Sequence, residues 1–514
     1  MKVCVIGGGV GGLTAAYRLC QRGFQVRLLE ASPDPGGLVS TFEIGGGRIE
    51  RFYHHIFSTD TTIVSLINEL GLSDSLVWRE SKVGVFHDGR IYRFVTPLDL
   101  LRFTPIPLVD RVRLGLVGLY LRRQKEWRRY EGVTAAEWIK RHAGRRNYEV
   151  VWGPLLRGKF GQHADDVSMA WFWGKIHLRF ASRRGGPLQK EQLGYMMGSF
   201  GLLVDVLSER IRQLGGLLET NRPVQRVVVE GGRAVALEVA GDKPERLDCD
   251  AIIATVPSQD FLSIVPDLPE EYAAKLRAVQ YQWALCLVLA LKRSLSPIYW
   301  MNISDRSVPF LALIEHTNFI GPEHYGGLHV AYLSNYLDEA SPLLKMDMDE
   351  ICQLFFPHLQ RINPAFSEEW VADRWLFRAP YAQPIIGTHY SRSIPEQRTP
   401  IAGLYLANMT QIYPEDRGQN YSIRLGEQVA ALAASDLEPA RRGRGRRLPR
   451  ASAGGSAGGG RPGPLGRLTP TRPSEPDAAA PSAADPWPRP GVAYGLQVVS
   501  MNGPIMSMSP TSME

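Results

Sequence analysis

Cysteine is scarce in this 514-residue chain, and its spacing excludes two kinds of site. The five cysteines are scattered, with no Cys-x-x-Cys pair among Cys4, Cys20, Cys249, Cys286 and Cys352. A disulfide framework or a zinc site needs paired or clustered cysteines. The sequence therefore predicts a protein of a reducing compartment without structural zinc.

Metal-binding histidine patterns and long apolar runs are also missing. No His-Glu-x-x-His motif, no Ser-His-Asp order and no metal-ligand spacing occurs, so we assign no metal. No run of about 18 apolar residues is present, which excludes a membrane-spanning helix. The apolar stretch after Met1-Lys2 breaks into glycines after four residues, unlike a signal peptide. These absences predict a cytoplasmic protein.

The formal net charge of +7 belongs mainly to the C-terminal segment. Residues 437–514 hold ten arginines and five acidic residues, which leaves a net charge of only +2 on the rest of the chain. This Arg-, Gly- and Pro-rich segment cannot bury enough apolar area to fold, so we predict a disordered tail. Its arginines suit nucleic acid or an anionic membrane, but a solvated tail with no specific nucleic-acid partner is the favoured interpretation.

What the sequence does contain is a glycine-rich loop at its start. The strand-like run Val3–Ile6 leads into Gly-Gly-Gly-Val-Gly-Gly at residues 7–12, before a helix-compatible stretch. In a Gly-x-Gly-x-x-Gly pattern, Gly7 permits a tight turn, Gly9 lets a pyrophosphate approach the backbone, and Gly12 lets the helix pack closely on the strand. The helix N-terminus then offers unpaired N–H groups to the phosphates. The pattern predicts a dinucleotide-binding βαβ unit.

Two later features indicate which dinucleotide is bound. A second strand ends at Glu30, where a carboxylate accepts hydrogen bonds from the ribose hydroxyls of adenosine. A further glycine pair, Gly36-Gly37, follows six residues later. Nicotinamide dehydrogenases have no need of this second glycine turn, whereas the stretch resembles flavoproteins with two dinucleotide-binding motifs. We therefore predict FAD as the cofactor.

Three separated segments are expected to build the FAD-binding domain, giving an α/β, Rossmann-like fold. Short buried strands at 250–257 and 403–408 supply further parallel strands, and a final helix follows at about 420–435. A hairpin through Gly231-Gly232 is expected at 226–235. The predicted domain comprises residues 1–50, 190–275 and 385–436.

The intervening residues 51–189 and 276–384 are predicted to form an interleaved α+β substrate domain. Residues 97–190 look helix-rich, and apolar strand candidates with one helix follow in 276–384. We expect an antiparallel sheet with helices, set over the flavin, because ligand sites prefer domain junctions. The strand candidates are 284–291, 310–315 and 328–333, and the helix is 347–360.

Taken together, the glycine loop with Glu30, the second glycine pair and the strands at 250–257 and 403–408 resemble the flavin-containing amine oxidase superfamily. The resemblance covers residues 1–436, approximately. Within the superfamily, the chain is similar to the protoporphyrinogen oxidase and phytoene desaturase branches. It implies an FAD-dependent oxidase, dehydrogenase or desaturase. The implied cofactor-binding residues are Gly7, Gly9, Gly11, Gly12, Glu30, Gly36, Gly37, Val224, Asn408, Gly418 and Asn420.

The segment before the last helix is the candidate flavin-facing edge. Reduced flavin is anionic near its N1 and O2 atoms, so a cation or a helix N-terminus should face that edge. Arg417 supplies the cation, Gly418 allows close backbone approach, and the helix begins near Asn420. An ordinary helix cap with a surface salt bridge between Asp416 and Arg417 is the alternative; the family's last helix points at the flavin, which favours the functional interpretation.

A histidine pair suggests a second relationship. Residues 52–60, Phe-Tyr-His-His-Ile-Phe-Ser-Thr-Asp, resemble a segment of UDP-galactopyranose mutases, which share the FAD fold and act on nucleotide sugars. In that interpretation His55 lies beside the flavin as a catalytic residue. The alternative is that His54 and His55 are ordinary domain-junction histidines.

Three features of the sequence bear on the substrate and its surroundings. Aromatic residues crowd 152–200, which suits an apolar substrate, but at this composition such residues more often belong to a core. Lys159 is a further candidate near the flavin that nothing local supports. The alternation of cations and apolar residues at 111–123 fits contact with the inner membrane face, although a helix packed on its own domain is favoured.

The sequence thus predicts an FAD-dependent enzyme that removes hydride from a C–C or C–N bond of an apolar small molecule. A mutase-like isomerase of a nucleotide sugar is the alternative enzyme, and a non-catalytic flavoprotein scaffold is a third class. The sequence leaves the oligomeric state open.

Overall fold

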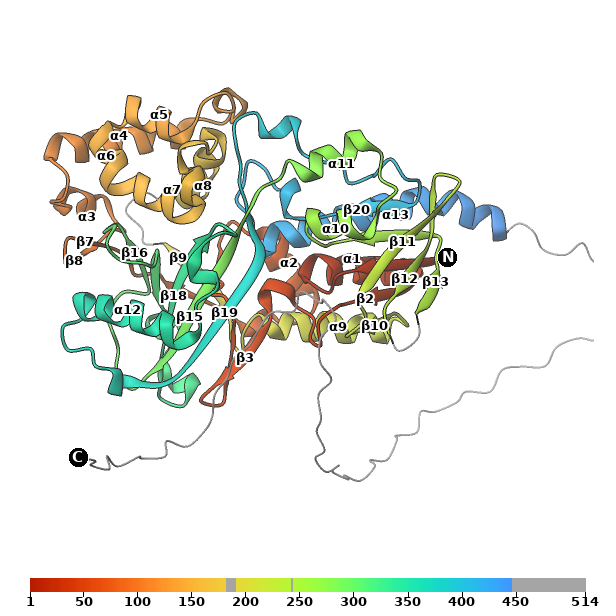
Figure 1. The fold of residues 1–514 in the computed structure, drawn as a ribbon, viewed down its shortest axis with the longest axis horizontal. Helices are drawn as coiled ribbons and strands as arrows, with labels where there is room; N and C mark the ends of the chain where they lie inside the picture. Colours follow the sequence, from red (N-terminus) through yellow and green to blue (C-terminus); the bar gives the residue numbers. More distant parts are fainter. Residues whose placement is uncertain (182–190, 242–243, 446–514) are drawn as a thin grey trace, which may run out of the picture. The chain divides into compact units, whose positions relative to one another are not determined.

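A five-stranded parallel sheet contains the amino-terminal βαβ unit in the computed structural model of the chain (Figure 1). The structure describes residues 1–181, 191–241 and 244–445. Strands from three separated parts of the chain pair in the order β10-β2-β1-β14-β20, so the predicted α/β class is confirmed. The strands are β1 (Lys2–Ile6), β2 (Gln25–Leu29), β10 (Leu217–Glu219), β14 (Ala251–Ala254) and β20 (Leu404–Leu406).

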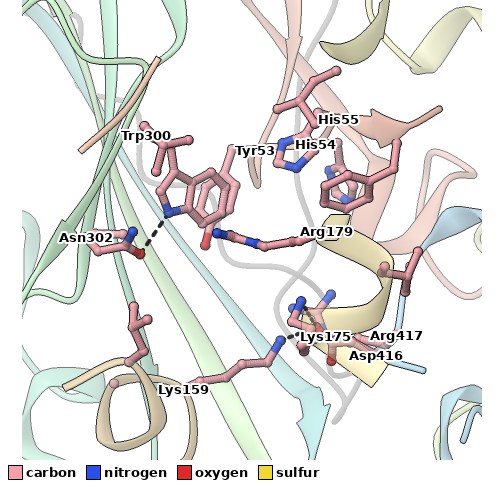
Figure 2. A pocket seen from close by; sticks show the side chains of 18 of the residues that line it. Tyr53, His54, His55, Lys159, Lys175, Arg179, Trp300, Asn302, Asp416 and Arg417 are labelled. Atoms are coloured by element: carbon pink, nitrogen blue, oxygen red, sulfur yellow. Dashed lines mark hydrogen bonds and ion pairs between the residues drawn. The ribbon is translucent and has the colours of Figure 1, made fainter. Parts of the chain in front are cut away.

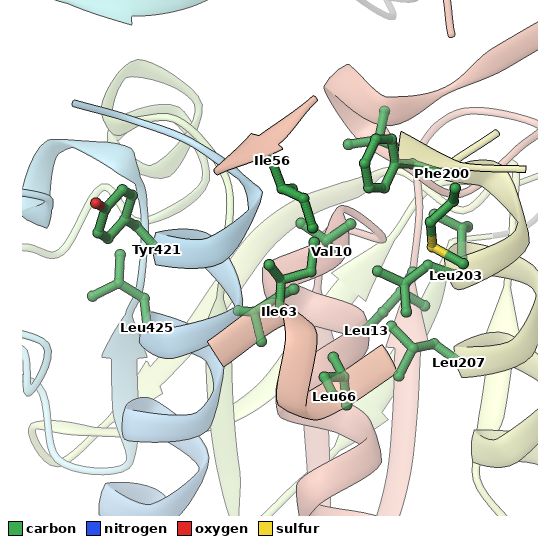
Figure 3. Close-up of a cluster of buried hydrophobic side chains, with 14 of the residues drawn as sticks. Val10, Leu13, Ile56, Ile63, Leu66, Phe200, Leu203, Leu207, Tyr421 and Leu425 are labelled. Atoms are coloured by element: carbon green, nitrogen blue, oxygen red, sulfur yellow. The ribbon is translucent and has the colours of Figure 1, made fainter. Parts of the chain in front are cut away.

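The two faces of this sheet carry different layers, because alternate side chains of β1 point to opposite sides. Val3 and Val5 pack into the core formed with helices α1, α9 and α13, part of which is drawn in Figure 3. Cys4 and Ile6 pack against the three-stranded sheet β11-β12-β13 and two short helices. The elements are α1 (Val10–Gln21), α9 (Gly201–Gln213), α13 (Gln419–Gly445), β11 (Val224–Glu230), β12 (Arg233–Val239), β13 (Glu245–Asp248), α10 (Ser258–Ile264) and α11 (Glu270–Arg277).

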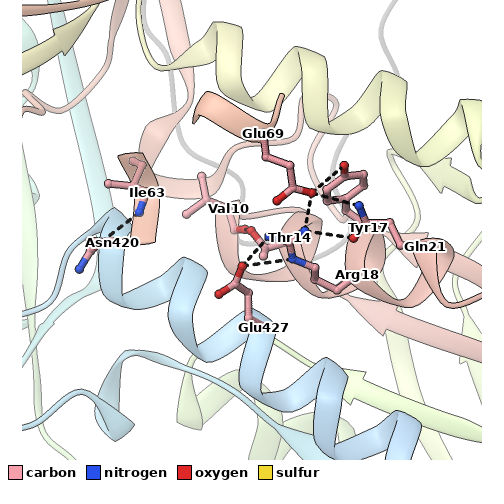
Figure 4. Close-up of polar contacts among 9 residues, drawn as sticks. All are labelled: Val10, Thr14, Tyr17, Arg18, Gln21, Ile63, Glu69, Asn420 and Glu427. Atoms are coloured by element: carbon pink, nitrogen blue, oxygen red, sulfur yellow. Dashed lines mark hydrogen bonds and ion pairs between the residues drawn. The ribbon is translucent and has the colours of Figure 1, made fainter. Parts of the chain in front are cut away.

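Helices α1 and α13 approach each other through glycines and run in the same sense. A Cβ on Gly426 would lie 2.3 Å from the carbonyl oxygen of Gly11, so only glycine allows this contact. Further along both helices, the Arg18 guanidinium is 2.6 Å from the Glu427 carboxylate (Figure 4). The N-termini of both helices therefore lie at the same end of the pair.

A second, seven-stranded sheet has the order β19-β15-β18-β17-β16-β7-β8. The sequence predicted an antiparallel sheet, but β16 and β7 pair in parallel. They come from distant parts of the chain, so no hairpin fixes their relative direction. The strands are β7 (Val83–His87), β8 (Arg90–Arg93), β15 (Tyr281–Leu291), β16 (Trp300–Ile303), β17 (Ala312–Glu315), β18 (His329–Leu337) and β19 (Val371–Pro384).

Strand β15 shows why this sheet is apolar on both faces. Leu285 and Leu287 pack in the core under helix α12 (Met348–Ile362), whereas Cys286 and Val288 join the core shared with the parallel sheet. Asp347 starts α12 as its N-cap and accepts the backbone N–H of Glu350 at 2.9 Å. The predicted strand and helix positions in 276–384 agree with these elements.

Most remaining helices gather into one helical layer beside the seven-stranded sheet (Figure 1). Strand β9 belongs to the segment assigned by sequence to the FAD-binding domain, yet it pairs with β5 and β6 from the other segment. The predicted domain boundaries stay a prediction, and residues 1–437 belong to a single compact unit. The remaining elements are α2 (Thr61–Glu69), α3 (Pro97–Arg102), α4 (Leu108–Arg123), α5 (Ala135–His142), α6 (Arg145–Asn147), α7 (Gly153–Phe160), α8 (Met169–Ala181), β3 (Thr41–Ile44), β4 (Gly47–Glu50), β5 (Ile56–Phe57), β6 (Leu76–Glu80) and β9 (Gln192–Met196).

The end of α13 corrects one boundary. The sequence predicted a helix to about residue 435 and disorder from 437, but α13 continues to Gly445. The apolar residues of the helix pack on the parallel sheet, and this anchored stretch extends the helix into the Arg-rich sequence. The predicted tail beyond residue 445 lies outside the described residues.

Candidate active site

The amino-terminal glycine loop has the close contacts that a dinucleotide-binding turn needs. A Cβ on Gly12 would lie 2.0 Å from the carbonyl oxygen of Gly7, so the helix sits on the strand end where only glycine fits. A Cβ on Gly9, by contrast, would meet nothing within 4 Å. The loop thus has one glycine for packing and one that leaves its outer side open to a ligand.

The second glycine pair lies directly against this loop. The N–H of Gly36 donates to the carbonyl oxygen of Gly8 at 2.9 Å, and a Cβ on Gly37 would be 3.5 Å from the Cα of Gly9. Gly36 has φ of 126°, a conformation that favours glycine. The two motifs are therefore one backbone cradle, although about 25 residues of chain separate them.

Glu30 sits at the end of β2 beside this cradle. Its Oε2 accepts the N–H of Gly8 at 2.6 Å, and its Oε1 accepts the N–H of Ser32 at 2.9 Å. The backbone N–H of Arg222 donates to the carbonyl oxygen of Glu30 at 2.8 Å. This hydrogen bond brings the segment that leads to Val224, the first residue of β11, next to the end of β2. The backbone N–H groups of Gly8 and Ser32 thus orient the carboxylate that is predicted to bind the ribose.

The start of α1 fits an anionic ligand. Its N-cap, Gly9, has no side chain to cap the first turn, so the first N–H groups lack a capping acceptor. The start of α13 lies at the same end, and the two positive helix ends together favour a negatively charged group.

Two predicted cofactor residues have structural contacts instead. A Cβ on Gly11 would lie 3.1 Å from the carbonyl oxygen of Ser422, so this glycine serves the packing of α1 on α13. The Asn408 side-chain NH2 donates to the carbonyl oxygen of Val256 and to the hydroxyl of Ser258, and its side-chain oxygen accepts from the N–H and the hydroxyl of Thr410. These four hydrogen bonds use every donor and acceptor of the Asn408 amide. For these two residues we therefore favour a packing and a bracing role.

A cavity of about 310 Å³ lies beside the start of α13 (Figure 2). Trp300 and Asn302 of β16 line one side, and Lys159 of α7 and Lys175 of α8 line the other. The histidine pair forms a further wall, and residues 416–421 border the cavity where α13 begins. The second sheet, the helical layer and the last helix therefore all contribute to one pocket.

A cationic cluster forms where α7, α8 and the start of α13 meet. We use this name for Lys159, Lys175, Asp416 and Arg417. Asp416 pairs with the ammonium groups of both lysines, at 2.6 Å for Lys175, and also accepts the indole N–H of Trp171 at 3.3 Å. The predicted alternative of a surface salt bridge fails, because Asp416 is only 7% exposed.

The protonation states follow from burial and from these close charges. Burial by itself would raise the pKa of Asp416, but the adjacent Lys159, Lys175 and Arg417 charges hold it below its ordinary value. Burial lowers the pKa of Lys175 to about 8, against the opposing effect of Asp416. Burial likewise lowers the pKa of Lys159. The Asp416 carboxylate is therefore ionised near neutral pH, and the pKa of Lys175, about 8, lies slightly above neutral pH.

Arg417 lies at the cavity edge but points along the second sheet. Its Nε donates to the side-chain oxygen of Gln383 at 3.0 Å, and its Nη2 donates to the hydroxyl of Tyr336. Both partners are neutral, so the guanidinium charge stays uncompensated by direct contact. Arg417 thus precedes α13 and lines the cavity, while its predicted place at the flavin edge stays a prediction.

Residues 418–420, where α13 begins, line the cavity. Gly418 lines the cavity, and a Cβ there would meet only the Tyr421 ring, at 3.8 Å. Asn420 accepts the N–H of Ile63 at 3.1 Å through its side-chain oxygen (Figure 4). Gln419 is 6% exposed, and neither atom of its amide has a hydrogen-bond partner among the described residues. A buried unpaired amide at a cavity wall indicates a polar ligand.

The predicted His55 does line the cavity. Its Nδ1 is 3.1 Å from the hydroxyl of Tyr299, and the Nδ1 of His54 is 2.6 Å from the carbonyl oxygen of Phe52. Burial lowers the pKa of His54 to about 4 and that of His55 to about 3, with Arg417 and Arg179 acting in the same direction. Both imidazoles are therefore neutral near pH 7.

Sequence reasoning missed several cavity residues. It did not select Lys175, Arg179, Trp300 or Gln419, and it left Lys159 aside. No local motif marks these residues, because they come from α7, α8, β16 and α13 and meet only in the folded chain. Their one shared signal is polar or charged character within strongly apolar segments.

The residues of the loop and of the cavity fit FAD. The open side of Gly9, the uncapped α1, the Glu30 carboxylate and the unpaired Gln419 amide suit a diphosphate, a ribose and a polar ring edge. No group of three or more His, Cys, Asp or Glu side chains suited to a metal occurs within 1–181, 191–241 and 244–445. The absence of a metal stays a prediction.

Comparisons with known proteins agree with this fit. A family model described as flavin containing amine oxidoreductase matches residues 10–414. A 15-cis-phytoene desaturase of an Oncidium hybrid cultivar is 27% identical over 297 residues, which are 53% of this chain and 48% of that protein. A coproporphyrinogen III oxidase of Staphylococcus aureus is 22% identical over 290 residues, 51% of this chain and 62% of that protein. The chain thus spans about half to three fifths of the length of these curated relatives.

The fold has solved counterparts as well. The crystal structure of a reduced UDP-galactopyranose mutase matches with a TM-score of 0.67 and 17% identity, covering 86% of this chain and 98% of that one. At such an identity the likeness concerns the fold. The family model, which spans most of the sequence, decides the relationship: the chain belongs to the flavin-containing amine oxidoreductase family, and its cofactor is FAD.

Proposed function

We propose that the protein is an FAD-dependent oxidoreductase that removes a hydride from a C–C or C–N bond of a small, largely apolar substrate. The single observation that carries this proposal is the cavity of about 310 Å³ that opens beside the first turn of α13. Bound FAD supplies the chemistry by accepting the hydride, and the chain supplies orientation, exclusion of water and charge.

The composition of the cavity wall supports an apolar substrate body. Leu155, Leu156, Ile176 and Leu193 line it together with aromatic side chains. Burial of apolar surface is worth about 25 cal/mol per Å², so such a wall binds and dries an apolar group. A dry site also strengthens every charge interaction at its edge.

The residues at the α13 end have electrostatic roles in the proposal. Arg417 and the positive end of α13 would favour negative charge on FAD bound at this end of the cavity. His55, which is neutral, acts as a hydrogen-bonding residue held by Tyr299 rather than as a cationic acid. Of the predicted catalytic pair, Arg417 is therefore the stronger candidate.

A mutase-like isomerase of a nucleotide sugar stays the second candidate. The fold likeness to the mutase and the position of the His54-His55 pair at the cavity favour it. The two activities differ in electron balance: an oxidoreductase transfers two electrons to an acceptor in each turnover, whereas the isomerisation has no net redox change.

Anaerobic flavin reduction separates the two candidates. We expect the FAD-loaded protein to lose its oxidised flavin absorbance when mixed with an oxidisable substrate, such as coproporphyrinogen III or an aliphatic amine, and to regain it with an acceptor. The matched test incubates dithionite-reduced protein with UDP-galactopyranose. Conversion of the sugar without net flavin oxidation would refute the oxidoreductase proposal and favour the mutase.

We also propose contact with an anionic membrane surface, through the outer face of α3 and α4. Helix α4 has two apolar faces. Leu114 and Leu121 on one face are buried, whereas Leu108, Val109 and Leu116 are 59%, 79% and 62% exposed. Exposed apolar patches of this kind mark interaction sites. None of the helices in the described ranges is long and apolar enough to cross a membrane.

The charge of the same region selects the partner. Residues 97–129 contain eight Arg or Lys and three acidic residues. An apolar helix face flanked by cations suits the headgroup region of an anionic bilayer, where apolar side chains insert and cations meet lipid phosphates. A cytoplasmic location at the inner membrane face, as expected from the sequence, is part of this proposal.

Vesicle co-sedimentation tests the membrane contact. We expect FAD-loaded protein to sediment with vesicles containing phosphatidylglycerol and less with pure phosphatidylcholine. Substituting Val109→Asp and Leu116→Asp should abolish sedimentation, whereas the control Leu354→Asp, at an exposed apolar position of α12, should not. The proposal is contradicted if the doubly substituted protein still sediments with the vesicles. It is also contradicted if the wild type forms a soluble dimer that this double substitution, but not the control, disrupts.

A further inference from the structure

The cavity is not uniformly apolar, and its cations are concentrated at one corner. Four cations and three carboxylates line it among the described residues. Three of the four cations, Lys159, Lys175 and Arg417, belong to the cationic cluster, where Asp416 is the only carboxylate (Figure 2). The acidic Asp60 accepts the backbone N–H of Phe57 at 2.8 Å, and within the described ranges it forms no ion pair with these lysines. The corner therefore carries an excess of positive charge.

Asp416 cannot neutralise this corner by itself. Both lysines contact its Oδ2, and its Oδ1 accepts from Trp171, so its oxygens are already engaged. Each ammonium has three N–H donors and directs one at Asp416. Apart from ring contacts with Trp171 and Tyr336, no other partner for these two ammonium groups is found in the described part of the chain.

The lysines remain accessible from the cavity. The Lys175 side chain is 37% exposed and that of Lys159 is 19% exposed, although both approach a carboxylate that is 8% exposed. Partly desolvated cations with unused donors gain most from a negatively charged hydrogen-bond acceptor, because charge-assisted bonds are about twice as strong as neutral ones. Such an acceptor would enter from the side of the cavity that holds the substrate.

We propose that the substrate is amphipathic and carries an oxyanion group, a carboxylate or a phosphate, that binds Lys175 and Lys159 at the cationic cluster. This inference rests on the proposed function, because it concerns the substrate of the same cavity. The oxyanion fixes one end of the molecule, and the apolar wall formed by Leu155, Leu156 and Ile176 holds the rest. The cluster thereby sets which bond of the substrate faces the cofactor.

Binding of three matched probes to the oxidised, FAD-loaded protein tests the proposal without turnover. The probes are 2-naphthoate, 2-naphthyl phosphate and the neutral 2-naphthamide, and isothermal titration calorimetry measures each Kd. We expect at least one anionic probe to have a Kd that is lower than that of the neutral amide by about tenfold or more. This is the effect of one charge-assisted hydrogen bond. The tighter of the two anions then identifies the oxyanion. Equal affinity for all three probes would overturn the proposal.

Two substitutions should change anion binding in opposite directions. Lys175→Met keeps the length of the side chain and leaves Lys159 to pair with Asp416, so the protein should fold and bind the anion about tenfold more weakly. Asp416→Asn removes the competing carboxylate and should tighten anion binding. The amide should bind both variants as it binds the wild type, and Lys175→Arg should restore anion affinity.

The controls separate this proposal from its alternatives. Lys275→Met, at a surface lysine 3.7 Å from Glu396, should leave all three affinities unchanged. A purely structural cluster would lower the affinity for anion and amide alike in both Lys175→Met and Asp416→Asn, which would refute the proposal. Failure of the oxidoreductase proposal shows itself elsewhere, in the flavin-reduction assay, because probe binding requires no electron transfer.

Discussion

Alanine at two glycines of the amino-terminal loop should separate cofactor binding from folding. Gly9 and Gly12 belong to one motif, but their surroundings differ. At Gly12 a Cβ would lie 2.0 Å from the backbone oxygen of Gly7 and 2.7 Å from Oγ1 of Thr255. At Gly9 it would meet nothing within 4 Å, and the backbone, with φ of −66° and ψ of 169°, suits alanine.

The magnitudes follow from these contacts. Overpacking of a core costs about 1–3 kcal/mol and more where the neighbour is rigid backbone, so Gly12→Ala should lower the free energy of unfolding by about 3 kcal/mol or more. Gly9→Ala should leave the apoprotein unchanged or stabilise it by about 0.4–1 kcal/mol, because alanine restricts the unfolded chain. Its methyl group nevertheless occupies the side from which the pyrophosphate approaches, so FAD affinity should fall by about tenfold or more, at least about 1.4 kcal/mol.

The assay measures both quantities on the same samples. Urea unfolding of apoprotein gives stability, and flavin fluorescence during titration with FAD gives the Kd. We expect Gly9→Ala to lose affinity at unchanged stability, and Gly12→Ala to lose stability first. A Gly9→Ala protein that binds FAD like the wild type would refute the assignment of this loop to the pyrophosphate.

Three further predictions concern Glu30, the cationic cluster and the helix pair. Glu30→Gln should weaken FAD retention on dialysis by roughly tenfold, because a charge-assisted hydrogen bond is worth about 1.5–3 kcal/mol; unchanged occupancy would exclude the ribose role. Since burial lowers the pKa of Lys175 to about 8 from 10.5, the unfolded chain binds more protons between these values. Stability should therefore rise with pH across this window, and Lys175→Met should flatten the rise in urea unfolding. Gly426→Ala should destabilise the protein in thermal unfolding, because its Cβ would lie 2.3 Å from the Gly11 carbonyl oxygen; an unchanged midpoint would contradict the close helix contact.

The cofactor end of the molecule was readable from the sequence because its signals are local. Gly7, Gly9, Gly12 and Glu30 lie within one βαβ unit, where spacing along the chain fixes spacing in three dimensions. The short buried strands at 251–254 and 404–406 were also recognisable, since parallel strands are continuous apolar runs. The resemblance to the flavin-containing amine oxidase superfamily, and the FAD that it implies, rest on these local motifs and agree with the match to residues 10–414.

The cavity was decided by tertiary structure alone. Lys159, Lys175 and Asp416 stand far apart in the sequence, and only the packing of α7 and α8 beside the start of α13 brings their charges within ion-pair distance. The exposed face of α4 has the same cause, because an apolar helix pattern does not tell which side faces the core. Sequence by itself determined the geometry of the amino-terminal glycine loop. Long-range packing, in which side chains from distant segments share one desolvated space, determined what lines the cavity.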